Sequence, residues 1–176
     1  MFFDNQLKAQ QQYKERKLPP EIIINKIITT SLSSSQIDFI RQCFFCFIAS
    51  SNKQGQCDCS FRGSDIDCAD SDLLLPLLKV ISPDVLIMPD FSGNGIFDTV
   101  GNFLDNKNIG MIFIDFEKGI RLRVNGEVKI LQPTSEYLTL WPNAKRIFEI
   151  TTKRCFFNCN KRIKTSFNKG KYYEYE

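Results

Sequence analysis

Residues 91–95 have the composition of a segment that can hold an anion. They read Phe-Ser-Gly-Asn-Gly and come directly before a stretch with helical spacing. Glycine lets a backbone approach a ligand closely, and the free amides at the start of a helix favour a phosphate or another anion near Ser92, Gly93 and Asn94. An ordinary loop between a strand and a helix has the same composition, and the glycines alone favour that plainer interpretation.

Two further segments contribute arginines. Arg121 and Arg123 alternate with apolar residues, so they project from one face of a predicted strand with Asn125 beside them. Two guanidinium groups suit a phosphate or the electron-rich end of a flavin, although charged alternating strands usually turn such side chains to solvent. Arg62 stands before Gly63 at the end of another predicted strand, where an arginine can bind an anion or belong to a simple turn.

The sequence contains no histidine, which removes several classes of site. A Ser-His-Asp triad, a Cys-His nucleophile pair and a His-ligated metal centre are all excluded. The seven cysteines include Cys43-x-x-Cys46 and Cys57-x-Cys59, but both pairs lie in or beside apolar strand-like runs, where cysteine behaves as a small hydrophobic residue. We therefore expect reduced, metal-free thiols, as in a reducing compartment.

Two charged segments also have plain interpretations. The acidic loop over residues 65–72 lacks the glycine and terminal glutamate of an EF-hand, so a solvated insertion is favoured over a cation site. The basic tail with its aromatic residues has the charge and stacking groups to contact single-stranded nucleic acid. A frayed terminus is the favoured interpretation, and nucleic acid is not an expected partner.

The pattern of the chain predicts mostly strands. A helix is expected over residues 21–30, a second from a capping box formed by Ser35 and Asp38, and a third over residues 96–104, where Phe97, Val100 and Leu104 share a face. Six strands with hairpin connections make a small antiparallel barrel the natural closure. The expected strands cover residues 43–49, 56–61, 85–88, 109–116, 120–131 and 145–157.

Length and composition fit one globular domain. The chain has 176 residues, is 43% hydrophobic, and contains 16 phenylalanines, which suit packed sheet faces. Its net charge of +3 is too small to indicate nucleic acid by itself. No apolar run approaches the ~18 residues of a membrane span, and the start of the chain lacks the features of a signal peptide. A cytoplasmic protein is expected.

Taken together in their order, these segments resemble the pyridoxamine 5′-phosphate oxidase-like, FMN-binding split-barrel family. The resemblance covers most of the chain, from about residue 33 to residue 163. It is carried by Cys59-Ser-Phe-Arg-Gly63, Pro89-Asp-Phe-Ser-Gly-Asn-Gly-Ile-Phe97, Val100-Gly-Asn102, Ile109-Gly-Met-Ile-Phe-Ile-Asp-Phe-Glu117, Arg121-Leu-Arg-Val-Asn-Gly126 and Phe157-Asn-Cys-Asn-Lys-Arg-Ile163.

The resemblance implies a six-stranded antiparallel split β-barrel of Greek-key type with N-terminal helices. It also implies a homodimer with FMN, or a deazaflavin, at the subunit interface. The expected organisation is an N-terminal arm and helix over 1–32, the FMN-binding domain over 33–163, and a basic tail over 164–176. The implied cofactor-binding residues are Arg62, Ser92, Gly93, Asn94, Asn102, Arg121, Arg123 and Asn125, with no side chain assigned a catalytic role.

The chain departs from the family in two places. Residues 64–83 do not resemble the usual short continuation after the Arg-Gly pair, and the C-terminal Arg/His substrate signature of true pyridoxamine-phosphate oxidases is missing. Vitamin B6 oxidation is therefore not expected. The leading hypothesis is a flavin-dependent oxidoreductase of unknown small-molecule substrate, in which the cofactor performs the chemistry. The alternative is a non-catalytic flavin or deazaflavin binder, or a member that has lost its cofactor.

Overall fold

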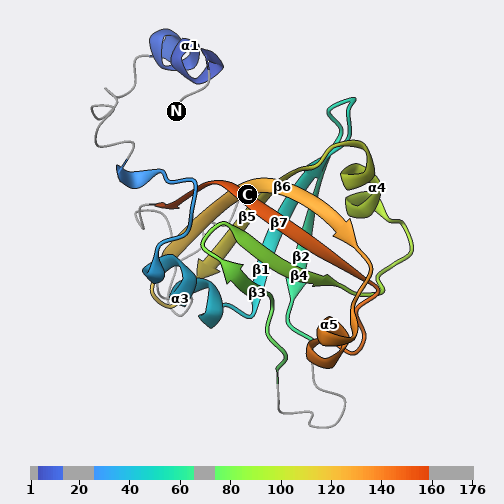
Figure 1. Cartoon of the computed structure of the whole chain (residues 1–176). Coiled ribbons are helices and arrows are strands. Elements are labelled where there is room, and N and C mark those ends of the chain that lie inside the picture. Colours follow the sequence, from blue (N-terminus) through green and yellow to red (C-terminus); the bar gives the residue numbers. More distant parts are fainter. Residues whose placement is uncertain (1–3, 14–25, 66–73, 159–176) are drawn as a thin grey trace, which may run out of the picture.

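The computed structural model of the chain describes residues 4–13, 26–65 and 74–158, and within them seven strands form one antiparallel sheet (Figure 1). The strands follow the order β2-β1-β5-β6-β7-β4-β3. The mainly β, antiparallel fold class is therefore confirmed, but the expected number of six strands is wrong. The strands are β1 (Phe45–Ser51), β2 (Cys57–Gly63), β3 (Lys79–Ser82), β4 (Val85–Asp90), β5 (Asn108–Asp115), β6 (Ile120–Leu131) and β7 (Arg146–Asn158).

Four short helices accompany the sheet in the described residues, and none of them is long and apolar enough to cross a membrane. They are α1 (Asp4–Tyr13), α3 (Ser34–Gln42), α4 (Asp98–Asp105) and α5 (Ser135–Leu140). Of the helix expected over 21–30, only residues 26–27 are helical among those described, because the chain is already extended at Thr29, which forms a bridge with Cys155 of β7.

The capping box of α3 lies two residues before its expected position. Ser33, in extended backbone geometry, accepts a hydrogen bond from the backbone N–H of Gln36, and the Gln36 side chain accepts one from the Ser33 N–H at 2.8 Å. The amide side chain of Gln36 is long enough to reach back to the cap, which makes this pair a better box than Ser35 and Asp38.

Strand β6 has the bounds and the alternation that the sequence predicts. Leu122, Val124 and Val128 are buried, while Arg123 and Lys129 are exposed. Because β6 pairs with β5 along one edge and with β7 along the other, its twelve residues form the centre of the sheet. The strict alternation shows one face turned to the core and the other turned away from it.

Strands β3 and β4 differ from expectation. The segment over residues 64–83 contains β3, which pairs with β4 as far as the Lys79–Ile87 position. Strand β4 does not stop at Pro89 but continues through it to Asp90. Beyond Ile87, β4 has only β7 as a neighbour, so a proline without an N–H is tolerated there. Asp90 therefore belongs to a strand rather than to the following loop.

The core has two parts. The larger one fills the sheet's interior and includes the edge-to-face pair Phe103–Phe148, whose ring centroids are 5.3 Å apart. The smaller one surrounds Trp141, which is fully buried and donates its indole N–H to the carbonyl of Pro76 at 2.6 Å. Trp141 directly follows α5, a six-residue helix that was too short to be recognised from periodicity.

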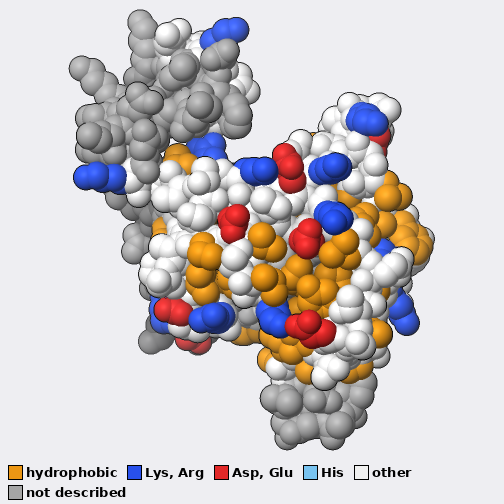
Figure 2. Space-filling model, in the orientation of Figure 1, with side chains coloured by type: hydrophobic (Ala, Val, Ile, Leu, Met, Phe, Trp, Pro, Cys, Tyr) orange, Lys and Arg blue, Asp and Glu red, His pale blue; other side chains and the backbone are white. Residues whose placement is uncertain are grey.

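Helix α4 buries a different face from the one expected. Thr99 and Phe103 are buried, whereas Leu104 is 79% exposed and Phe97, just before the helix, is 55% exposed. Figure 2 shows hydrophobic side chains on the surface where α4 lies in Figure 1. The reason is that the polar inner face of β2 attracts the Thr99 hydroxyl, which turns Leu104 outward.

Gly126 offers a direct test of the sheet packing. A Cβ at this position would overlap the backbone carbonyl of Thr151 on β7. Gly126→Ala should therefore lower the free energy of unfolding by about 2 kcal/mol. Gly101→Ala is the matched control, since a Cβ there meets open space on the α4 surface and should raise stability by up to about 1 kcal/mol. Urea unfolding midpoints measure both, and an unchanged midpoint for Gly126→Ala would contradict the close packing.

Candidate functional site

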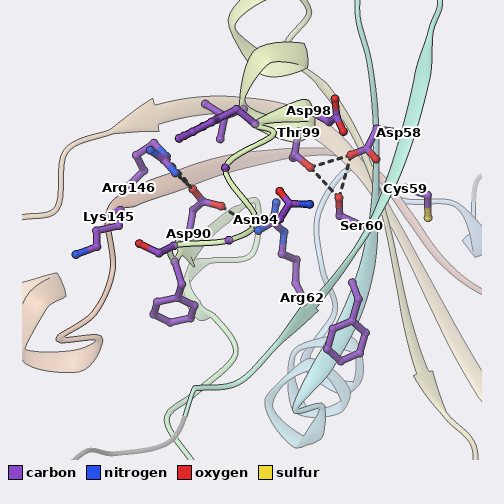
Figure 3. Close-up of a pocket in the computed structure, with 17 residues that line it drawn as sticks. Asp58, Cys59, Ser60, Arg62, Asp90, Asn94, Asp98, Thr99, Lys145 and Arg146 are labelled. Carbon is purple, nitrogen blue, oxygen red and sulfur yellow. Dashed lines mark hydrogen bonds and ion pairs between the residues drawn. The ribbon is translucent and has the colours of Figure 1, made fainter.

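A cavity of about 730 Å³ opens beside the inner face of β2 (Figure 3). Five elements form it: β2, the end of β4, the loop after it, the start of α4 and the start of β7. The polar groups that line it gather from segments far apart in the sequence. They include Asp58, Ser60, Arg62, Asp90, Ser92, Asn94, Asp98, Thr99, Lys145 and Arg146.

Asp90 lies at the base of this cavity between two arginines. Its side chain is only 3% exposed, and each of its carboxylate oxygens has a guanidinium partner. Arg62 donates from Nη1 to Oδ1 at 2.9 Å, and Arg146 donates from Nε to Oδ2 at 2.7 Å. Arg146 is also the register partner of Asp90 across the β4–β7 pair. A buried carboxylate held in this way fixes both guanidinium groups in position.

The loop after Asp90 carries the residues that the sequence associated with a phosphate. Ser92, Gly93 and Asn94 are exposed and line the cavity. The Asn94 side chain accepts a hydrogen bond from the Ile96 N–H at 3.0 Å, which shapes the turn. Gly95 has a φ of 80°, a conformation that favours glycine. The loop is thus held open toward the cavity by its own short-range contacts.

Helix α4 begins without a side-chain cap. Its N-cap residue, Phe97, has a left-handed φ of 65° and makes no capping hydrogen bond. The ring of Phe97 instead lies under the guanidinium of Arg146, 5.2 Å from its centroid. The first amides of α4 therefore lack the hydroxyl or carboxylate acceptor that most helices supply at this position.

The opposite side of the cavity is acidic. Asp58 on β2 accepts hydrogen bonds from the hydroxyls of Ser60 and Thr99, each at 2.9 Å through the same oxygen, Oδ2. Asp98, the first residue of α4, lines the same side. Neither Asp58 nor Asp98 has an ion-pair partner among the described residues.

The arginines of β6 do not reach this cavity within one chain. The sheet register places Arg123 in a row with Ile112, Phe47 and Phe61 on the outer face, whereas Arg62 shares the inner face with buried Cys46. The outer row borders a second hollow of about 340 Å³, lined also by Arg121 and Asn125. The predicted site residues are thus divided between two hollows on opposite sides of β2.

The remaining predicted residue, Asn102, lies in neither hollow. Its amide donates to the Ser50 hydroxyl at 3.0 Å and so ties α4 to β1. Conversely, the structure places Lys145, Arg146 and Asp58 at the cavity, and sequence reasoning assigned none of them a role. The only signal in the sequence was the adjacent basic pair at the start of the last strand. Such pairs are common on ordinary surfaces, so this one did not indicate a site.

Of the cysteines near β1 and β2, burial makes Cys43 and Cys46 unreactive. Burial raises the pKa of the Cys43 thiol to about 11 and that of Cys46 to about 12, so neither is a ready thiolate. Cys57 and Cys59 are exposed free thiols. In the described part of the chain no three Cys, Asp or Glu side chains gather as a metal-binding group.

Comparison with solved structures identifies the fold. A structure described as a putative pyridoxamine 5′-phosphate oxidase from Lactobacillus delbrueckii matches with a TM-score of 0.55, over 73% of this chain and 95% of that one, at 14% identity. HupZ from Group A Streptococcus matches with a TM-score of 0.53, over 72% and 93%, at 17% identity. The chain therefore has the split-barrel fold of the pyridoxamine 5′-phosphate oxidase-like proteins.

HutZ of Vibrio cholerae, described as a heme storage protein, matches with a TM-score of 0.48, over 72% of this chain and 94% of that one, at 10% identity. No protein-family model matches the sequence, and no curated protein matches it.

Asp90→Asn tests the ion-pair cluster. Removing the charge leaves two guanidinium groups, each about a fifth exposed, facing one another without an anion, which should lower the free energy of unfolding by about 3 kcal/mol. Asp38→Asn removes an exposed partner of Arg41 and should change stability by less than about 0.5 kcal/mol. If denaturant unfolding shows the two variants to be equally stable, Asp90 does not hold the cluster together.

Proposed function

We propose that this split-barrel chain binds FMN, with the phosphate group at the cationic side of the cavity beside β2. The observation that carries the proposal is that Lys145, Arg62 and Arg146 line the same cavity as the exposed loop over residues 92–94. Phosphate is bound in proteins by this combination of guanidinium, ammonium and backbone N–H donors. Arg62 and the loop over residues 92–94 keep the roles that the sequence assigned them.

The donors available at this side fit a phosphate. Arg62 lines the cavity and places its guanidinium charge beside it, although the side chain uses Nη1 for Asp90. Lys145 is exposed and has no ion pair among the described residues. An arriving anion would pair with Lys145, which the described chain leaves without a counter-ion.

The cavity also has the size and lining of a cofactor site. A volume of about 730 Å³ falls within the usual range for sites that take drug-sized ligands, and Phe61, Phe91 and Phe97 add apolar surface among its polar groups. A bound flavin supplies electron or hydride transfer. The chain's own residues would bind and orient it: Asp90 keeps the two arginines in place, and Phe97 packs against one of them.

The role of the outer face of the sheet is, we propose, to bind a second copy of the chain. The rings of Phe61, Phe45 and Phe116 lie nearly parallel, with centroids 5.6 and 6.2 Å apart, and Phe61 is 61% exposed. A contiguous exposed aromatic surface favours a partner that covers it. Arg121 and Arg123 line the outer hollow together with Phe47, whose ring contacts those of Phe45 and Phe61. Their proposed role is therefore at the interface rather than at the phosphate.

Lys145→Gln tests the FMN proposal with little risk to folding, because the side chain is exposed and unpaired. Loss of a charged hydrogen bond to the phosphate should weaken FMN binding about tenfold. Gly93→Val should also weaken binding by narrowing the cavity, although a Cβ at Gly93 meets no neighbour within 4 Å and the fold should tolerate it. Quenching of flavin fluorescence on titration gives the dissociation constants.

Lys107→Gln is the matched control, since Lys107 is exposed and lies outside the cavity. Absence of FMN binding by the unmodified chain, or equal binding by Lys145→Gln, Gly93→Val and Lys107→Gln, would contradict the proposal. Deazaflavin and hemin titrations run in parallel show whether another cofactor binds instead. Turnover with NADPH and an electron acceptor distinguishes a flavin-dependent oxidoreductase from a binder without activity.

Light scattering tests the proposed dimer. The unmodified chain should have twice the monomer mass at micromolar concentration, because covering the aromatic surface removes it from water. Phe116→Asp places a charge in that surface and should shift the mass toward the monomer. Leu104→Asp changes an equally apolar but separate position on α4 and should leave the mass unchanged. A monomeric unmodified chain would show that this surface does not bind a second copy.

A further inference from the structure

Two of the described cysteines, Cys57 and Cys59, have a position that packing does not explain. Cys46 and Cys155 are fully buried and Cys43 is half-buried, whereas Cys57 and Cys59 are exposed. Cysteine is among the residue types most often buried, so two exposed thiols one residue apart are an unusual pair. The expectation that the thiols are metal-free rested on burial in apolar strands, which this pair lacks.

The two thiols project from the same face of one strand. Cys57 and Cys59 are separated by a single residue of β2, and successive side chains of a strand alternate between its faces. Figure 3 shows the Cys59 sulfur on the opposite side of β2 from Asp58 and Ser60. In the strand order of the described chain β2 comes first, so its outer edge pairs with no further strand. Both thiols are therefore accessible from the same side of an edge strand.

The spacing of this pair is poor for a disulfide and suitable for a bridging ion. Residues two apart in a strand have Cα atoms about 6.7 Å apart, at the far end of the range that disulfides accept. An ion between two thiolates needs the sulfur atoms only about 4.5 Å apart, because each metal–sulfur bond is about 2.3 Å long. The Cys57 thiol is held only by a long hydrogen bond to the carbonyl of Gly55, at 3.4 Å, and can turn toward Cys59.

The surroundings of the pair offer no further strong ligand. In the described chain no third Cys, Asp or Glu side chain joins the two thiols, and the sequence contains no histidine. Across the β1–β2 pair, Cys57 faces Ser51, whose hydroxyl accepts a hydrogen bond from the Asn106 amide. Cys59 faces Ala49, which has no ligand atom in its side chain. A structural zinc ion needs four ligands and calcium needs six or more, so neither suits this pair.

From this geometry we propose that Cys57 and Cys59 bind one copper(I) ion through their two sulfur atoms. Soft thiolate ligands select copper(I), which accepts two ligands in a linear arrangement. Binding releases the two thiol protons to solvent and leaves a bis-thiolate complex with a net charge of −1, with no change in oxidation state. The inference goes beyond the proposed function, because the pair lies on the other face of β2 and needs no flavin.

Competition with the copper(I) chelator bicinchoninate tests the site on the full chain, without oxygen and with ascorbate as the reductant. The chain should remove one copper(I) ion per molecule from the coloured chelator complex. Cys57→Ser and Cys59→Ser should each weaken copper(I) binding at least about a hundredfold, because a single thiol loses the advantage of two tethered ligands. Both positions are exposed, so the variants should fold, which circular dichroism checks.

Cys68→Ser and Cys159→Ser are the matched controls, since they change the two cysteines that lie outside the described residues. Both should bind copper(I) like the unmodified chain. X-ray absorption at the copper edge should show two sulfur neighbours. Failure of the unmodified chain to take copper(I) from the chelator would overturn the inference. So would unchanged binding in Cys57→Ser or Cys59→Ser, a third sulfur neighbour, or an equal loss of binding in either control.

The copper(I) site and the FMN site can be distinguished in the same variants. Cys57 does not line the cavity, so Cys57→Ser should bind FMN like the unmodified chain. If copper(I) binds through the pair and FMN does not bind, the cofactor proposal is wrong and the thiol site stands. If FMN binds in a Lys145-dependent way and copper(I) is not taken up, only the thiol site is wrong.

Discussion

The buried carboxylate of Asp90 joins parts of the sheet that no backbone ladder connects. Strand β2 lies at one end of the strand order and β4 lies next to the other end, so the two share no ladder hydrogen bonds. The Arg62–Asp90 ion pair spans this separation, and Arg146 holds the second oxygen from β7. Burying a carboxylate is costly, and two guanidinium partners offset that cost only if all three groups stay in place. The position of β2 relative to β4 thus depends on this cluster.

The same cluster decides what the cavity can bind. One carboxylate neutralises only part of the charge of two arginines, and Lys145 adds a further cation that has no ion-pair partner in the described chain. The arginines cannot relax toward Asp58, because Asp90 holds both. A cluster built for the fold therefore produces a cavity with two charged sides, and the proposed phosphate site follows from this stabilising contact.

How much the sequence predicts depends on the range of the interactions involved. Strand β6 was predicted at its exact bounds, because strict alternation is a local signal that the finished sheet preserves. Asp90 was placed in a loop, because Pro89 normally ends a strand and only the early end of β3 makes the proline tolerable. Arg62 and Arg123 were assigned to one anionic group, but alternation shows only which residues share a face. The curvature that brings β2 toward β4 decides which hollow each face borders, and that is a property of the whole sheet.

Strand β2 belongs to both proposed binding surfaces. It is an edge strand, with one face on the cavity and the other on the aromatic surface. None of its residues is fully buried. Its inner face presents Asp58, Ser60 and Arg62 to the cavity, and its outer face presents Phe61 to the aromatic surface, while Cys59 borders both hollows. An interior strand packs one face against the core, so only its other face is available to a ligand or a partner. Because successive side chains of one strand move with a common backbone, a partner docked on the outer face and a ligand bound in the cavity would constrain the same seven residues. The proposed dimer surface and the proposed ligand site therefore both depend on the position of β2, which Asp90 sets.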